Sequence, residues 1–145
     1  MSLWRREAIE RFPEMHREIA DTPNTTILWF DLWYDLFKPA YEKEPPDEEV
    51  IRHVYDYAYW SLKHRSSEVA TSAIVSFFEH LPDDFQMRRE MPRWISQEDF
   101  DMLWFAWEYT TKQKFADFRK EFVENKARID KEKQTRRPAA KAGRH

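Results

Sequence analysis

Two pairs of ionisable residues in this sequence have a spacing that is compatible with acid–base chemistry. The first pair is Asp31 and Asp35, which are four positions apart within an otherwise apolar stretch. On a helix, residues four apart lie on the same edge, so the two carboxyl groups would be neighbours. Two neighbouring carboxyl groups that are partly buried can differ in pKa and can act as an acid and a base. Alternatively, the two aspartates form the solvent edge of the helix or pair with an arginine.

The second pair is Glu79 and His80, at the predicted end of another helix. Such a couple can serve in catalysis, but the spacing implies neither a nucleophile nor a third residue. A histidine near a helix C-terminus is also stabilised by the helix dipole and can bond to free carbonyl groups. Glu79 is expected on the side of the helix opposite its apolar face, toward solvent or a partner. We therefore predict no catalytic residue and no enzymatic activity.

Several other kinds of site are excluded by residue types that are missing or rare. The chain has no cysteine, which excludes disulfides, zinc sites built on thiolates and a cysteine nucleophile. Its single glycine, Gly143, lies near the end of the sequence, so loops that bind phosphates or dinucleotides are not expected. The histidines have none of the spacings of the common metal-binding helix motifs. We predict neither a metal ion nor a cofactor.

Aromatic residues make up 17% of the chain, more than one core of this size ordinarily needs. Tyr55 and Tyr59 lie away from the main apolar face of their predicted helix, and Met102, Phe105 and Tyr109 form a second apolar set on the last predicted helix. These side chains are either buried on a second side, part of an interface with a partner or a second copy, or the lining of an aromatic-ligand pocket. The residues predicted to bind a partner are acidic and aromatic: Asp31, Asp35, Tyr55, Tyr59, Glu79, Phe105 and Tyr109.

The net charge of −3 combines two oppositely charged parts of the chain. Residues 1–125 contain 16 Lys or Arg and 25 acidic residues, a net charge of −9, whereas residues 126–145 contain 8 and 2, a net charge of +6. An acidic body repels nucleic acids and anionic membranes and steers a basic protein toward it. The basic segment either stays a solvated tail or binds a phosphate backbone without sequence preference.

Prolines and capping residues, rather than glycines, divide the chain into segments with helical periodicity. We predict one all-α domain of five or six helices over residues 1–125, followed by a disordered basic tail over residues 126–145. Residues 27–37 are apolar nearly all round, which predicts a central, buried helix; a strand is the competing interpretation of residues 25–30. Ser96 begins the last helix through a capping box, and a continuous aromatic stripe predicts that this helix reaches about residue 125.

No apolar stretch has the length or the flanking residues of a membrane span or a signal peptide. The expected location is therefore the cytoplasm.

Four segments carry a resemblance to known proteins. They are Asp56-Tyr-Ala-Tyr-Trp, then Val69 to Pro82 with Ala73-Ile-Val-Ser-Phe-Phe-Glu-His-Leu-Pro at its centre, and Pro92-Arg-Trp together with Phe105-Ala-Trp-Glu-Tyr. In these segments, within residues 46–109, the chain resembles small uncharacterised bacterial all-helical proteins. Some of those are similar to immunity proteins, which bind and neutralise a toxin. The resemblance implies a helical fold and a binding role, and it transfers no catalytic residue.

These observations predict a non-enzymatic protein-binding module, such as an immunity or accessory protein with an acidic, aromatic-rich surface. The expected partner is a basic protein or a second copy of the chain. One alternative is a nucleic-acid-associated protein that acts through residues 126–145. A second alternative is a small helical enzyme that uses a carboxylate pair.

Overall fold

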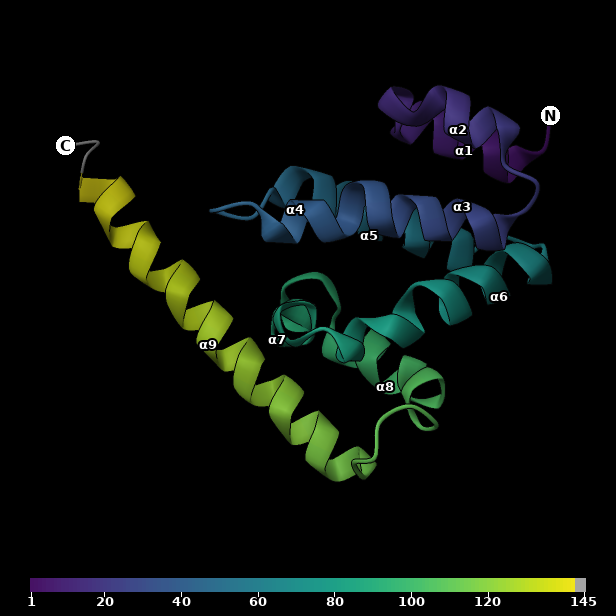
Figure 1. Cartoon of the computed structure of the whole chain (residues 1–145). Helices are drawn as coiled ribbons and strands as arrows, with labels where there is room; N and C mark the ends of the chain where they lie inside the picture. The colour runs from purple at the N-terminus through teal and green to yellow at the C-terminus, as the bar shows by residue number, and fades with distance from the viewer. Residues whose placement is uncertain (143–145) are drawn as a thin grey trace. The chain divides into compact units, whose positions relative to one another are not determined.

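The computed structural model describes the backbone of residues 1–142 and the side chains of residues 1–135. In this part of the chain all regular secondary structure is helical and no strand is formed, which confirms the predicted all-α class. The chain divides into two compact units, an N-terminal unit, Met1–Leu81, and a C-terminal unit, Pro82–His145. Figure 1 shows the helices of each unit with the labels used below.

Two of the helices in the N-terminal unit begin at polar side-chain caps. The side chain of Asn24 accepts a hydrogen bond from the Ile27 N–H at 2.9 Å, and that of Asp47 accepts one from the Val50 N–H at 3.3 Å. Each bond satisfies a backbone donor that the first helical turn leaves free. The elements are α1 (Leu3–Arg11), η1 (Pro13–Met15), α2 (His16–Asp21), α3 (Thr25–Leu32), η2 (Trp33–Phe37), α4 (Lys38–Glu42), α5 (Glu48–Leu62), α6 (Ser67–Ser76) and η3 (Phe78–Asp83), which ends just past the unit boundary.

Helix α5 is the central helix of the N-terminal unit, because it packs against α1, α4, η2 and α6. Toward α1, the Tyr57 hydroxyl donates to the Trp4 carbonyl oxygen at 2.9 Å. Toward η2 and α6, the Tyr55 ring lies edge-on to the rings of Phe37 and Phe77, with centroids 5.7 and 5.1 Å apart. Both faces of α5 are therefore buried, which is why a second apolar face in its sequence does not indicate an exposed surface.

Helix α3 is not central, so the prediction of a fully buried helix over residues 27–37 was wrong. The segment is helical from Thr25, which decides against the strand interpretation. Its inner side, with Leu28, Trp29 and Leu32 buried, packs against α6. Because α5 already occupies the centre, no helix among the described residues of the N-terminal unit covers the outer side of α3, and several of its large side chains stay exposed.

The helix continues from α3 into α4 through η2, a wider π-helical turn in which the Lys38 N–H donates to the Trp33 carbonyl oxygen. Pro39 explains why the turn lies here. A proline has no N–H to donate, and its ring crowds the carbonyl group four residues earlier, which is that of Asp35. The wider turn relieves this conflict and lets the chain remain helical.

The C-terminal unit contains α7 (Phe85–Trp94), α8 (Gln97–Trp107) and α9 (Phe115–Ala142). The Asp84 side chain accepts from the Met87 N–H at 3.0 Å and caps α7. Ser96 caps α8 by accepting from the Asp99 N–H at 3.1 Å, which confirms the start predicted from the capping box.

The aromatic stripe that predicted one helix from Ser96 to residue 125 belongs to two helices. Helix α8 ends at Trp107, whose carbonyl oxygen accepts from the N–H groups of Thr110 and Thr111, and α9 begins at Phe115. The chain reverses so that Phe100 of α8 stacks on Phe118 and Phe122 of α9, at centroid distances of 5.3 and 4.2 Å. The prediction of a single helix was wrong. When the chain reverses, the aromatic residues of α8 and α9 bury one another, whereas in one straight helix they would need a different element to cover them.

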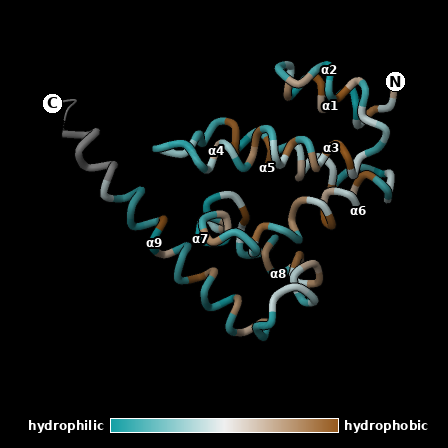
Figure 2. The backbone as a smooth tube through the Cα atoms, viewed as in Figure 1, coloured by the Kyte–Doolittle hydropathy of each residue, from teal (hydrophilic) through white to brown (hydrophobic). Residues whose placement is uncertain are grey.

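The start of the tail at residue 126 must also be corrected. Helix α9 continues to Ala142, and Ile129 is buried. Figure 2 shows the described part of α9 as mainly hydrophilic with isolated hydrophobic residues. These apolar residues and the ion pairs to α7 described next explain why the helix extends beyond residue 125, which the charge pattern alone did not indicate.

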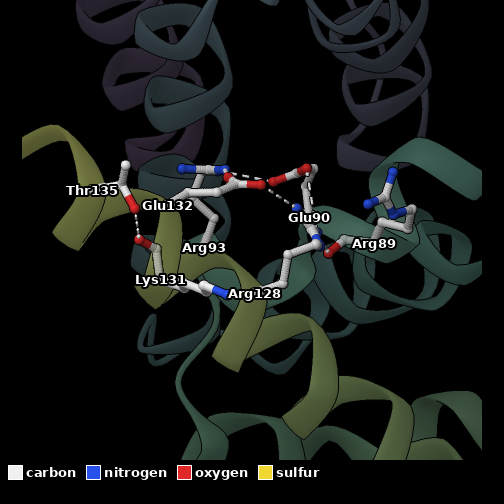
Figure 3. Close-up of polar contacts among 7 residues, drawn as sticks. All are labelled: Arg89, Glu90, Arg93, Arg128, Lys131, Glu132 and Thr135. Carbon is white, nitrogen blue, oxygen red and sulfur yellow. Dashed lines mark hydrogen bonds and ion pairs between the residues drawn. The ribbon is translucent and has the colours of Figure 1, made fainter.

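Four charged residues join α7 to α9, and we call them the α7–α9 clasp: Glu90, Arg93, Arg128 and Glu132 (Figure 3). Arg93 lies 2.9 Å from Glu90 and 3.4 Å from Glu132. Arg128 lies 3.6 Å from Glu90 and 3.1 Å from Glu132, and it also donates to the Arg89 carbonyl oxygen. Each of the four charges therefore has two partners of opposite sign.

The number of helices differs from the prediction as well. In the described residues, α3, η2 and α4 form one continuous helix, so this part of the chain has eight helices rather than five or six. The linker over residues 108–114 separates two helices that the sequence pattern had merged. The two compact units divide after Leu81, and the predicted domain boundary after residue 125 stays a prediction. None of the helices described is both long enough and apolar enough to cross a membrane.

Candidate partner-binding surface

The outer side of α3 and η2 carries the candidate site, which we call the α3 face: Ile27, Phe30, Asp31, Tyr34 and Asp35. The spacing of these residues, at i, i+3, i+4, i+7 and i+8, places them on one side of the helix. Ile27, Phe30 and Tyr34 are exposed by 41, 59 and 51%.

The two aromatic rings of the α3 face touch each other rather than the core. The centroids of Phe30 and Tyr34 are 4.7 Å apart, and the ammonium group of Lys38 lies 5.7 Å from the Tyr34 centroid. Aromatic pairs and cation–π contacts of this kind hold side chains in a defined position. The pair is therefore an ordered apolar surface that remains open to solvent.

Negative charge surrounds this aromatic pair. Asp31 is half-buried, and its burial raises the pKa of its carboxyl group above the ordinary value; the charges of Asp35 and of Glu18 on α2 raise this pKa further. No ion pair or side-chain hydrogen bond among the described residues includes Asp31, Asp35 or Glu18. The α3 face thus combines exposed aromatic rings with carboxylates that make no ion pair in the described part of the chain.

The predicted acid–base pair Asp31 and Asp35 is located on this face, next to exposed aromatic rings. No hydroxyl or imidazole group among the described residues makes a hydrogen bond to either carboxyl group. Their arrangement can attract a cation.

The second predicted pair does not form a couple. Glu79 and His80 both lie in η3, and no hydrogen bond or ion pair among the described residues includes Glu79. The His80 ring instead lies edge-on to the Trp33 ring, at a centroid distance of 6.2 Å. Glu79 is half-buried, so it adds to the charge of the N-terminal unit and is not part of the α3 face.

Of the two α5 tyrosines predicted to bind a partner, one is clearly a core residue. Tyr55 is only 2% exposed, so a partner cannot reach it in the folded protein, and its assignment to a binding surface was wrong. Tyr59 is half-buried, with its ring edge-on to Phe78 at 5.7 Å.

The other predicted aromatic residues lie in the C-terminal unit. Met102, Phe105 and Tyr109 are exposed by 57, 51 and 89%, on the side of α8 away from its contact with α9 and just beyond its end. Asp101 beside this surface pairs with Arg119 at 3.0 Å, whereas Glu98 and Glu108, which also border it, make no ion pair among the described residues. This surface therefore resembles the α3 face in its exposed apolar side chains and differs in having one neighbouring acid paired.

Sequence reasoning missed Ile27, Phe30 and Tyr34. It assigned every large apolar residue of this helix to the core, because the segment has almost no polar side. The available signal was that these residues lie close to Asp31 and Asp35. Two acids on the solvent edge of a helix indicate that the positions next to them are also close to solvent. Phe30 and Tyr34 immediately precede those acids in the sequence.

The comparisons with known proteins add no relative. No model of a known protein family matches the chain, and no curated protein or solved structure matches it. Among the described residues, no group of three or more His, Asp or Glu side chains could hold a metal ion. The functional argument therefore depends on the geometry of the α3 face.

Proposed function

We propose that this chain is a non-enzymatic protein-binding module that takes a basic partner on the α3 face. One observation carries the proposal: the ordered, exposed pair Phe30 and Tyr34 lies beside carboxylates that no residue of the described chain neutralises. Exposed aromatic residues are enriched where proteins bind each other, and contiguous exposed apolar residues are typical of partner surfaces.

The charge of the surrounding unit favours a basic partner. The N-terminal unit contains 15 acidic residues and 9 Lys or Arg, a net charge of −6, whereas the C-terminal unit contains 12 and 15, a net charge of +3. A surface inside a negatively charged unit increases the rate at which a positively charged protein finds it. Immunity and accessory proteins, which act by occupying a partner's surface, are modules of this kind.

The test is an affinity purification from the native host that compares the full chain with the double variant Phe30→Ser/Tyr34→Ser. The matched control is Met102→Ser/Phe105→Ser, which removes two exposed apolar side chains from α8 instead. We expect a stoichiometric basic protein that is retained by the wild type and the control and is lost from the α3 variant. Retention of the same protein by both variants would overturn the proposal.

The nucleic-acid alternative receives less support from the described residues. In the segment from residue 126, Lys126 is paired with Asp130 at 3.5 Å, and Arg128 is paired within the α7–α9 clasp. These cations are partly neutralised and would have to leave their partners to reach phosphate groups. The side chains of residues 136–145 lie outside the described residues. Recovery of nucleic acid alone in the purification, lost on deletion of residues 126–145, would favour this alternative.

A further inference from the structure

The α3 face has a shape that restricts the kind of segment that can cover it. Its residues lie along one side of the continuous helix formed by α3 and η2, and side chains arranged in this way pack into the grooves between side chains of another helix. A partner that bound as an extended strand would need an unpaired sheet edge, and the described residues form no strand. A helix is therefore the complementary element.

The carboxylates restrict the partner further. Asp31 and Asp35 are four residues apart, which is about 6 Å along a helix axis. Two basic side chains four residues apart on a partner helix have the same separation, so each can meet one aspartate while apolar side chains between them cover the rings. Lys38 lies over the Tyr34 ring and makes no ion pair with either aspartate, so both carboxylates remain available to the partner's cations.

Building on the proposed function, we infer that the partner segment is an amphipathic helix whose apolar side covers Phe30 and Tyr34. Two arginine or lysine side chains of that helix, four residues apart, pair with Asp31 and Asp35. The complementarity of charge carries the inference, because these acids make no ion pair within the described chain.

The raised pKa of Asp31 provides a second test of this inference, through the pH dependence of binding. The charged groups that act on Asp31 are Asp35 on the same helix and Glu18 on α2, both negative, while α6 on the inner side contributes none. A bound cation would lower the raised pKa of Asp31, so binding would release protons where Asp31 is partly protonated in the free protein. The affinity should therefore fall as the pH is lowered through the raised pKa of Asp31.

The experiment measures fluorescence anisotropy of labelled synthetic peptides with the full chain. The first probe is an amphipathic Leu/Ala helix of about 18 residues, long enough to be partly helical alone, with two arginines four residues apart. The second probe has glutamine at those two positions. We expect the arginine peptide to bind about tenfold more tightly than the glutamine peptide, which corresponds to two modest ion pairs. In the variant Asp31→Asn/Asp35→Asn this preference should disappear.

Two further variants separate the possible outcomes. Glu10→Gln/Glu14→Gln removes the same charge from two exposed residues, also four apart in the same unit, and should keep the preference for arginine. Phe30→Ser/Tyr34→Ser should weaken the binding of both peptides. Circular dichroism of each variant checks that the helices are retained.

The inference and the proposed function fail in different ways. If the glutamine peptide binds as tightly as the arginine peptide and only the Phe30/Tyr34 variant loses binding, the α3 face is a docking site but the inference of a basic helix is wrong. If neither peptide binds at about 1 mM, the inference is also wrong, while the purification still tests the proposed function. If the arginine peptide binds every variant equally, the α3 face binds no basic helix, and the proposed function loses its support as well.

Discussion

The α3 face and the α7–α9 clasp are both half-exposed regions with several charges, yet their charges are arranged in opposite ways. In the clasp, Glu90, Arg93, Arg128 and Glu132 each have two partners of opposite sign (Figure 3). On the α3 face, Asp31 and Asp35 make no ion pair among the described residues, and the charge of another acid, Glu18, acts on Asp31. The clasp satisfies its own charges and holds two helices together, whereas the carboxylates of the α3 face have no such pairing within the described residues.

The aromatic residues of the two units show the same contrast. Phe100 is completely buried among Trp107, Phe118 and Phe122. Phe30 and Tyr34 contact each other and remain more than half exposed. Stability should therefore depend strongly on the first group and hardly at all on the second, and the following four measurements test this difference.

The largest effect is expected from Phe100→Ala. Removing a fully buried ring loses its transfer free energy and leaves a cavity, which should lower the free energy of unfolding of the C-terminal unit by about 3–5 kcal/mol. Urea unfolding followed by tryptophan fluorescence measures the change. Phe105→Ala, on the exposed side of the same helix, is the control and should change stability by at most about 0.5 kcal/mol. Equal effects of the two substitutions would contradict the packing of α8 on α9.

The next effect is expected from Arg128→Ala, which removes two ion pairs and one hydrogen bond of the α7–α9 clasp. Because the network is partly buried, we expect a loss of about 1 kcal/mol that shrinks at high salt. Arg128→Met keeps the aliphatic stem over the helices and separates the loss of charge from the loss of packing. A loss that does not change with salt would indicate that packing, and not pairing, holds α7 and α9 together.

A smaller effect is expected from Phe30→Ser/Tyr34→Ser. The two rings are more than half exposed and lie outside the core, so the free energy of unfolding should change by about 0.5 kcal/mol or less. Thermal unfolding of the double variant measures this change, with Phe77→Ala as a destabilising reference in the same unit. A large loss of stability would make Phe30 and Tyr34 structural residues and would remove the basis of the α3 face as a binding surface.

The smallest effect, and one of opposite sign, is expected from Asp31→Asn. The pKa of Asp31 is raised above its ordinary value of 3.8 in the folded protein, so the folded state binds more protons than the unfolded state between these two values. Stability therefore falls as the pH rises through this interval, and Asp31→Asn should remove that fall.

At neutral pH the substitution should stabilise the protein by about 0.3 kcal/mol, since solvent screens a half-exposed group. Unfolding measured across a pH series provides the test, and Asp35→Asn gives the companion measurement. If Asp31→Asn destabilises the protein at neutral pH, the carboxylate has a partner in the fold and is not available to a ligand.

Local rules in the sequence determined where several helices begin. Ser96 and Asp47 cap α8 and α5 because their side chains accept hydrogen bonds from backbone groups three residues ahead, an interaction that needs no distant residue. Periodic apolar residues and the lack of glycine likewise determined the all-α class. The acidic character of the N-terminal unit also follows from the sequence alone, because charge counts do not depend on the fold.

The tertiary structure decided which apolar faces are covered. Residues 27–37 and α5 both have enough apolar residues to be central, and only the packing of α1, α4 and α6 around α5 places Tyr55 inside and Phe30 outside. In the same way, the reversal after Trp107 lets Phe100 stack on Phe118 and Phe122, although a single continuous helix satisfies the local pattern equally well. The hydrophobic effect is not directional: it favours covering an apolar side chain but does not specify which element covers it. The packing of the whole unit determines that element.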